Sequence, residues 1–399
     1  MVVAKFETTT QSFFAPLYRK LRGEGMKRKL TELCSIQYGY PFDSAKFTED
    51  SNYPQLIRIR DVKRGYSETF YSGEYPKEYI VHAGDLLIGM DGEFNIARWK
   101  SQDALLNQRV CKISAKEGTN EEYLRYALIG ALKEIEERTS FATVKHLSAK
   151  ELNKLELDVP SYEEQKNMAD MINKIEKIIG ARQQQLSALD SLIKARFVEM
   201  FGDPVINPKG WEKCSLSDEA EIKIGPFGSF LHKEDYITGG HALVNPSHIV
   251  DGKIVTDNNL SVSDAKYAEL SAYHLKRGDV VMGRRGEMGR CAIVEEDGLL
   301  CGTGSLIIRS NGDLSADFIH RIISFPSFKR TIEDMAVGQT MPNLNVPIVS
   351  SFLIIKPPKS VQDKYYAFVA QVEKSKANIQ KSLEKSQLLF DSLMQEYFG

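Results

Sequence analysis

The chain has 399 residues, which is long enough for two or three domains that each bury a core of their own. Hydrophobic residues make up 42% of it and charged residues 27%, as in an ordinary soluble protein, and no apolar run reaches the roughly 20 residues needed to cross a bilayer. The formal net charge of −2 does not indicate a nucleic-acid binder, so any DNA-binding surface must arise from local clusters of cations.

The cysteine pattern favours reduced thiols in a cytoplasmic protein over a disulfide framework or a zinc site. The five cysteines are odd in number, scattered and without a Cys-x-x-Cys pair. The seven histidines show no metal-ligand spacing. The N-terminus lacks the basic region and apolar core of a secretion signal. We therefore expect no metal site and no membrane association.

Residues 1–25 form a segment that does not belong to the repeated part of the chain. Two interpretations stay open for it, an N-terminal extension or a short docking helix. The sequence pattern of residues 26–142 predicts short strands joined by turns. Strands are predicted at 55–60, from alternating polar and apolar residues, and at 85–89, and a helix at 120–138.

A long helix is predicted at 161–200. It begins at Pro160-Ser161, with Glu163 and Glu164 placed in the first turn to suit the helix dipole. Apolar residues recur along it in a seam of heptad type: Ile172, Ile175, Ile179, Leu186, Leu189 and Ile193.

The second half of the chain follows the same plan. Strands are predicted at 241–244, 278–282, 291–294 and 305–308, and a helix at 317–323. A second long helix carries the matching seam: Val369, Val372, Ile379, Leu383, Phe390 and Leu393. Two such seams favour packing on each other, antiparallel, as a rod about 60 Å long.

The helices reveal an internal repeat. Residues 143–202 can be laid over 340–399 at one constant offset without a gap, so that Leu147 falls on Leu344 and Gln165 on Gln362. The repeat predicts five segments: an extension (1–25), a globular domain (26–142), a lead-in segment with a long helix (143–202), a second globular domain (203–339), and a second lead-in segment with a long helix (340–399). The expected fold class is α+β, with two similar strand-rich mixed α/β domains joined by an antiparallel coiled-coil spacer in a pseudo-two-fold repeat.

This order of elements resembles a known family. Each long helix follows a Thr-x-x-x-Leu segment that leads to proline, namely Thr143-Val-Lys-His-Leu147 and Thr340-Met-Pro-Asn-Leu344. Together with Gly225-Pro-Phe-Gly-Ser229 and the strand at 278–282, the plan resembles the DNA specificity subunit of type I restriction-modification systems, over nearly all of the chain from Met26 onward.

The resemblance implies a function. In that family each target recognition domain reads one half of a split sequence in double-stranded DNA, and the paired helices set the distance between the halves. The helices also dock two methyltransferase subunits, which methylate adenine with S-adenosylmethionine, and through them an ATP-driven restriction subunit. The chain itself is expected to be non-catalytic and to hold no cofactor. In keeping with this, its one Pro-Pro, Lys356-Pro-Pro-Lys359, lacks the flanks of an adenine methyltransferase motif, and no Walker-type lysine motif is present.

Candidate DNA contacts are cationic, amide and hydroxyl side chains near strands and turns, because such groups reach base edges and phosphates. In the first domain these are Arg58, Arg60, Lys63, Arg64, Asn107 and Arg109. In the second they are Asn245, Ser247, His248, Arg284, Arg285 and Arg290. Two other functions remain open: the specificity subunit of another bipartite restriction-modification system, and a coiled-coil adaptor without DNA contact.

Overall fold

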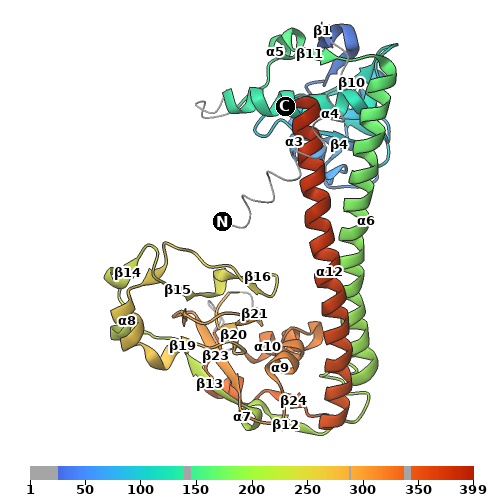
Figure 1. Ribbon diagram of the computed structural model, residues 1–399. Coiled ribbons are helices and arrows are strands. Elements are labelled where there is room, and N and C mark those ends of the chain that lie inside the picture. The colour runs from blue at the N-terminus through green and yellow to red at the C-terminus, as the bar shows by residue number, and fades with distance from the viewer. Residues whose placement is uncertain (1–25, 139–144, 287–288, 337–342) are drawn as a thin grey trace. The chain divides into compact units, whose positions relative to one another are not determined.

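The computed structural model describes residues 26–138, 145–286, 289–336 and 343–399 (Figure 1). The expected N-terminal extension, and Thr143 and Thr340 of the lead-in segments, lie outside the described residues. The chain divides into two compact units, Met1–Gln185 with Asn378–Gly399, and Leu186–Ala377. Two helices of 40 residues, α6 (Tyr162–Phe201) and α12 (Lys359–Phe398), contribute to both units.

The first domain (residues 26–159) is built around a four-stranded antiparallel sheet in the order β2-β10-β7-β8. Its strands are β2 (Cys34–Tyr38), β10 (Val110–Ala115), β7 (Leu86–Gly89) and β8 (Ile96–Arg98). Helices α3 (Ile59–Arg64) and α4 (Glu121–Arg138) contact this sheet, and every residue of the central β7 is buried.

A second sheet of the first domain has the order β3-β5-β4-β9-β6, in which β4 and β9 run parallel. Its strands are β3 (Phe47–Thr48), β5 (Phe70–Tyr71), β4 (Gln55–Ile57), β9 (Ala104–Leu106) and β6 (Ile80–Val81). The remaining short elements are α2 (Leu30–Leu33), η1 (Ser44–Lys46), η2 (Lys77–Tyr79) and α5 (Ala149–Lys154).

The second domain (residues 213–355) repeats both sheets, as the duplicated sequence predicts. Its four-stranded sheet has the order β13-β23-β20-β21, from Ala220–Ile224, Ser305–Ser310, Val280–Gly283 and Cys291–Ile293. Its five-stranded sheet has the order β14-β18-β15-β22-β19, from Tyr236–Ile237, Ser261–Val262, His241–Val244, Leu299–Cys301 and His274–Leu275, with β15 and β22 parallel. The other elements are α7 (Leu216–Glu219), η3 (Gly228–Phe230), η4 (Lys233–Asp235), η5 (Pro246–His248), β16 (Ile249–Val250), β17 (Lys253–Ile254), α8 (Asp264–Glu269), η6 (Ser271–Tyr273), α9 (Ala316–Ile323), α10 (Pro326–Met335) and α11 (Val346–Ser350).

The way into each long helix is also duplicated. A two-stranded ribbon closes each domain, β1 (Met26–Lys29) with β11 (Glu156–Val159) and β12 (Lys213–Ser215) with β24 (Leu353–Ile355). At the start of each helix the side-chain amide of a buried glutamine, Gln165 or Gln362, donates to the carbonyl of Pro160 or Pro357. These matching bonds join the first turn of each helix to the proline between the ribbon and the helix.

The two long helices run antiparallel. In the first unit the early part of α6 packs against the late part of α12. In the second unit the late part of α6 packs against the early part of α12. The predicted seam residues of the first cluster are Ile172, Ile175, Ile179, Phe390 and Leu393, and those of the second are Leu189, Ile193, Val369 and Val372. The remaining seam residues, Leu186, Ile379 and Leu383, are half-buried.

The seam is not apolar throughout, which the heptad pattern did not indicate. The guanidinium of Arg182 donates to the carbonyl of Ser382 over 2.6 Å and to the hydroxyl of Ser386, which is buried. A polar contact therefore interrupts the hydrophobic packing inside the first unit. A paired polar group within a helical interface favours one register over its neighbours.

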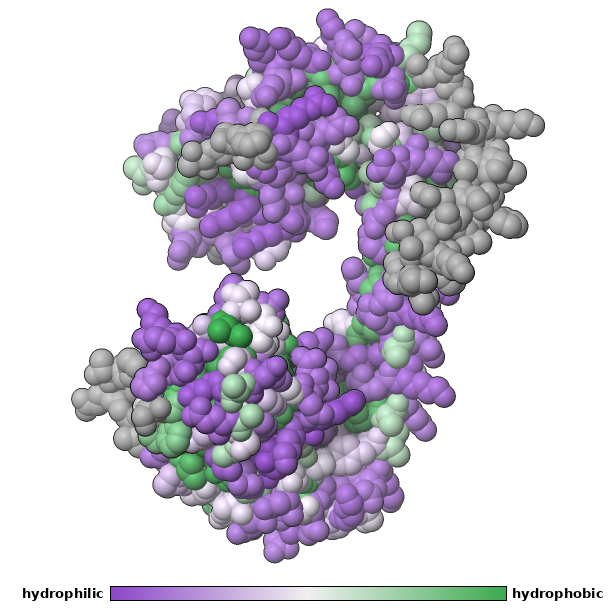
Figure 2. Space-filling model, turned by 60° about the vertical axis from the view of Figure 1, so that its left-hand side comes forward, coloured by the Kyte–Doolittle hydropathy of each residue, from purple (hydrophilic) through white to green (hydrophobic). Residues whose placement is uncertain are grey.

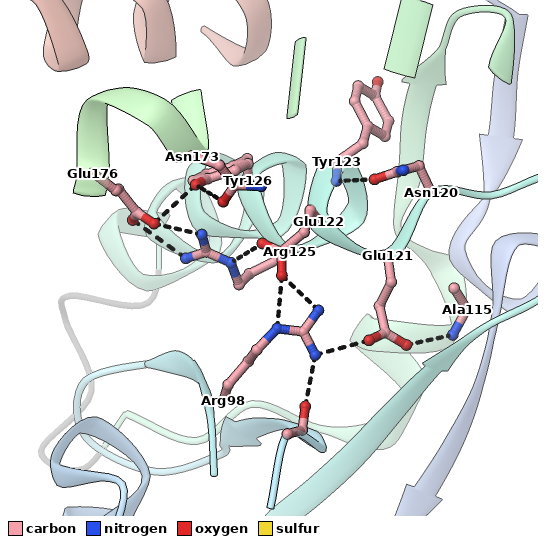
Figure 3. A network of polar contacts seen from close by, with 11 residues as sticks. Arg98, Ala115, Asn120, Glu121, Glu122, Tyr123, Arg125, Tyr126, Asn173 and Glu176 are labelled. Carbon is pink, nitrogen blue, oxygen red and sulfur yellow. Dashed lines mark hydrogen bonds and ion pairs between the residues drawn. The ribbon is translucent and has the colours of Figure 1, made fainter. Parts of the chain in front are cut away.

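A polar network fixes the first domain to α6 (Figure 3). Arg125 of α4 donates to Glu176 of α6 over 2.7 Å, and the Tyr126 hydroxyl donates to Asn173 over 2.8 Å. Burial alone would raise the pKa of Glu122, but the hydrogen bond and charge of Arg125, helped by Arg98, hold it below its ordinary value. The network thus orients the domain on the helix with charge-assisted bonds.

The sequence-based strand at 55–60 was too long. The strand β4 ends at Ile57, and α3 begins at Ile59. The reason is local, because the Asp61 carboxylate accepts the backbone N–H of Arg58 over 2.9 Å and so satisfies a free donor at the helix start. Gly65, with φ of 79°, ends the helix.

Candidate nucleic-acid interface

The first domain has an open hollow at one edge of its five-stranded sheet. Because β4 and β9 are parallel neighbours, Arg58 and Asn107 follow them at the same edge. The hollow has a volume of about 420 Å³. It is lined by cationic and polar residues, namely Arg58, Arg60, Arg109, Asn107, Gln108 and Ser44, and by the apolar residues Phe42, Phe47 and Ile59. The structure therefore brings together four of the six residues predicted in this domain.

Arg58 and Arg60 lie on a ridge that two hollows share. The second hollow, of about 730 Å³, lies on the side of Ser67 and Thr69 and is also lined by these two arginines. The Arg60 side chain is 57% exposed and its Nε lies 3.7 Å from the buried Asp61 carboxylate. Arg58 is exposed as well, so both guanidinium groups are accessible to an anionic partner.

Lys63 and Arg64 lie on the last turn of α3, outside the first hollow. Lys63 pairs with Glu93 over 3.3 Å, and Arg64 lies 4.0 Å from Glu68. All four side chains are about half exposed or more, so water and salt screen these ion pairs and a phosphate can compete for the cations.

Asn107 and Arg109 share a turn but differ in exposure. Asn107 is only 8% exposed, and its side-chain oxygen accepts the backbone N–H of Gln108, so that it shapes the turn. Arg109 is half exposed and has φ of 70°, a left-handed conformation that few non-glycine residues adopt. Its guanidinium contacts Asp91 and His146.

In the second domain the corresponding edge is formed by the ends of β15 and β22. Asn245 follows β15, as Arg58 follows β4, and Ser247 is exposed. His248 is different, because it is buried and its Nδ1 lies 2.7 Å from the Leu243 carbonyl. Its hydrogen bond stabilises η5 from within, and we leave His248 out of the proposed DNA-contacting surface.

The three arginines after β20 lie next to this edge. Arg290 donates to the carbonyl of Pro246 over 3.3 Å, which joins the two predicted clusters. Arg284 is half-buried and donates to the side-chain oxygen of Asn343 over 3.1 Å, and Arg285 is exposed. Burial, and then the charge of Arg285, lowers the pKa of Arg284, but a guanidinium keeps its proton in proteins.

Sequence reasoning missed three residues that contact the predicted arginines: Asp91 and His146 beside Arg109 in the first domain, and Asn343 beside Arg284 in the second. A signal was present for two of them, because His146 and Asn343 match in the gap-free repeat. Asp91 carried no signal, because its partners come from distant segments that meet only in the fold.

The face of the molecule drawn in Figure 2 is mostly hydrophilic, with hydrophobic groups in small patches. Within the described residues we find no cluster of His, Cys, Asp or Glu suited to a metal ion. None of the helices in this part of the chain is long and apolar enough to cross a membrane. All five cysteines are free thiols.

Known proteins share this plan. A family model described as the type I restriction modification DNA specificity domain matches residues 23–190 and 208–387. The specificity subunit of the type I restriction enzyme EcoBI from Escherichia coli is 29% identical over 296 residues, which cover 68% of this chain and 62% of that relative. The chain thus matches less than two thirds of that relative's length. The MjaVIII specificity subunit from Methanocaldococcus jannaschii is 20% identical over 375 residues, covering 87% and 84% of the two chains.

Solved structures have the same fold. The crystal structure of the S subunit of a type I restriction-modification system from M. genitalium matches with a TM-score of 0.54 and 15% identity, over 94% of this chain and 96% of that one. A chain from a structure of type I restriction-modification complex assembly also gives 0.54, with 13% identity over 94% and 98%. At these identities the likeness extends to the fold alone.

Proposed function

Because the chain belongs to the family of type I restriction-modification DNA specificity domains, we propose that it is the DNA-binding specificity subunit of such a system. Each domain contacts one half of a split target in double-stranded DNA. The chain itself is non-catalytic and binds no cofactor. Adenine methylation and ATP-dependent cleavage belong to subunits that assemble on it, in the cytoplasm, where free thiols persist.

The observation that carries this proposal is one edge built twice with different side chains. At the end of β4 the first domain exposes the cation Arg58, and at the equivalent end of β15 the second domain has the half-buried amide Asn245. A repeated frame with different polar side chains suits two reading surfaces for two unlike half-sites, because base edges are distinguished by their donors and acceptors.

The long helices support docking of two methyltransferase subunits, one for each unit, with the restriction subunit joining through them. Leu192 of α6 and Leu389 of α12 occupy matching positions of the repeat, and their exposed fractions are 45% and 49%. The same helices also expose Ile178, Val198 and Leu388, and exposed apolar side chains of this number suit a protein interface. Two matching positions suit two copies of one partner.

Co-expression with the cognate methyltransferase tests both parts. We expect adenine methylation at one split motif, and DNA binding that weakens steeply with salt as phosphate contacts release counterions. Leu192→Glu and Leu389→Glu should each reduce the methyltransferase content of the purified complex from two copies to one. An adaptor without DNA contact would instead leave no methylated motif and no salt-dependent DNA binding.

A further inference from the structure

The junction between each domain and its lead-in segment is built alike in the two copies. In the first copy the carbonyl of Met90 accepts the N–H of Leu147 over 2.7 Å. In the second the carbonyl of Arg284 accepts the N–H of Leu344 over 3.0 Å. Met90 and Arg284 are the residues that follow the equivalent strands β7 and β20. They are therefore structurally equivalent, although one is apolar and the other is a cation.

Two further contacts extend the equivalence. The N–H of Met90 donates to the carbonyl of Arg109, as the N–H of Arg284 donates to that of Gly304. Isolated antiparallel bridges then pair Asp91 with His146, and Arg285 with Asn343. His146 and Asn343 therefore hold the same place in the two junctions, one residue before the matched leucines.

In the first copy this residue holds an arginine. His146 Nδ1 donates to the Asp91 carboxylate, and Asp91 is three-quarters buried. The Arg109 Nη1 lies 3.1 Å from both ring nitrogens of His146, and its Nε lies 3.6 Å from Asp91. The backbone of Arg109 is also left-handed. The direction of its guanidinium group is therefore restricted both by the backbone of the turn and by the contacts with Asp91 and His146.

In the second copy the equivalent residue also holds an arginine, but a different one. Asn343 Oδ1 accepts from Arg284 Nε over 3.1 Å. The position equivalent to Arg109 is Gly304, which has no side chain to orient. The junction residue thus binds an arginine from the turn after β9 in one copy and from the turn after β20 in the other.

We infer that His146 and Asn343 are positioning residues for sequence recognition, each fixing one arginine, Arg109 or Arg284, for a base edge in its half-site. The inference rests on the proposed function. A guanidinium group held in one direction can donate two parallel hydrogen bonds to the edge of a guanine. A freely rotating arginine can form the same bonds, but it loses more side-chain entropy when it does so. Asp91 supports the first arginine directly and through His146.

The test is the methylation motif of complexes that carry His146→Ala, His146→Gln or Asn343→Ala. We expect His146→Ala to lower discrimination at one base pair of one half-site by about tenfold, within the range for a bidentate contact, and to leave the other half-site unchanged. Asn343→Ala should do the same to the opposite half-site. His146→Gln should restore discrimination, because an amide can donate to Asp91 and accept from Arg109.

The unaffected half-site of each variant is an internal control for folding, and thermal unfolding of the complex supplies a second. The inference would be overturned if the variants left both motifs unchanged, or if base discrimination fell equally in the two half-sites. It would also be overturned if DNA binding became weaker while the motif stayed intact, because the arginines would then contact phosphates. If the wild-type complex gives no split motif, the proposed function itself fails, which is a different result from a split motif that these variants leave unaltered.

Discussion

Phe398, the penultimate residue of the chain, packs against Tyr123 of α4 in the first domain, with ring centroids 5.4 Å apart. Phe201, which matches Phe398 in the repeat, packs against Phe318 of α9 in the second domain, with ring centroids 4.9 Å apart. Each long helix therefore ends on a domain, and the end of the chain returns to its first domain. Phe398 thus packs against the hydrophobic core of the first domain.

Replacing these aromatic residues should destabilise one unit each. We expect Phe201→Ala, at a fully buried position, to lower the free energy of unfolding by about 4 kcal/mol, and Phe398→Ala, at a half-buried one, by about 2 kcal/mol. Hydrogen exchange of the α9 and α4 amides measures the two losses separately. Leu388→Ala on α12 is the control, because Leu388 is 70% exposed. A Phe398→Ala variant as stable as that control would refute the packing role.

The Arg125 network should matter more than surface ion pairs. Arg125 is 13% exposed and bonds to Glu122 and Glu176. We expect Arg125→Met to cost about 2 kcal/mol, because it leaves the Glu176 carboxylate without its charged donor and Glu122 with Arg98 alone. Glu134→Gln breaks the exposed pair with Arg138 and should cost under about 0.5 kcal/mol. Chemical denaturation compares the two variants, and equal losses would contradict the account.

The second unit should lose stability in mild acid through His320. Burial lowers the pKa of His320, with the charge of Asp317 opposing this. The folded state therefore prefers the neutral ring, and stability falls as the pH drops below the ordinary histidine pKa of about 6.5 towards the lower folded value. His320→Gln should remove this pH dependence, whereas His82→Gln, at an exposed position, should keep it. The measurement is the free energy of unfolding of each variant from pH 7.5 to pH 5. If its slope against pH in His320→Gln equalled that of the wild type, the explanation would be contradicted.

Arg58 and Arg60 should contribute to DNA affinity through the ridge they form. If each contacts one phosphate, Arg58→Ala with Arg60→Ala should reduce the slope of log affinity against log salt by about 1.8. Binding of the assembled complex to its target at several salt concentrations measures this slope. Lys381→Ala, an exposed change on α12, should leave it unaltered. If the arginine variant and the Lys381→Ala control both had the salt slope of the wild type, Arg58 and Arg60 would not be part of the DNA interface.

Gly39 should be needed for the turn that carries Arg109. A Cβ at residue 39 would lie 2.0 Å from the Asn107 carbonyl oxygen, so the turn would have to move. We expect Gly39→Ala to destabilise the first unit by about 2 kcal/mol and to weaken recognition of one half-site. In Gly180→Ala, inside α6, the new methyl group meets open space and should stabilise the helix by up to about 1 kcal/mol. Equal effects of the two changes would contradict this explanation.

Much of the fold follows from local patterns in the sequence. The period of apolar residues predicted both long helices, and the repeat predicted that the two domains share a frame. The polar contact of Arg182 with Ser386 was not predictable, because it depends on the register of two helices far apart in the sequence. The site was predicted only in part. Clusters such as Arg58 and Arg60 are local, but the Asp91–His146 pair forms across the junction of two distant segments.

The central claim is that each domain specifies one half of a split target. Its most direct test is methylome sequencing of cells in which residues 203–339 have been exchanged for the matching domain of another specificity subunit, with the cognate methyltransferase present. The account predicts a split adenine-methylation motif in which one half changes and the other half stays as in the wild type. A change in both halves, or a motif that the exchange leaves untouched, would contradict it.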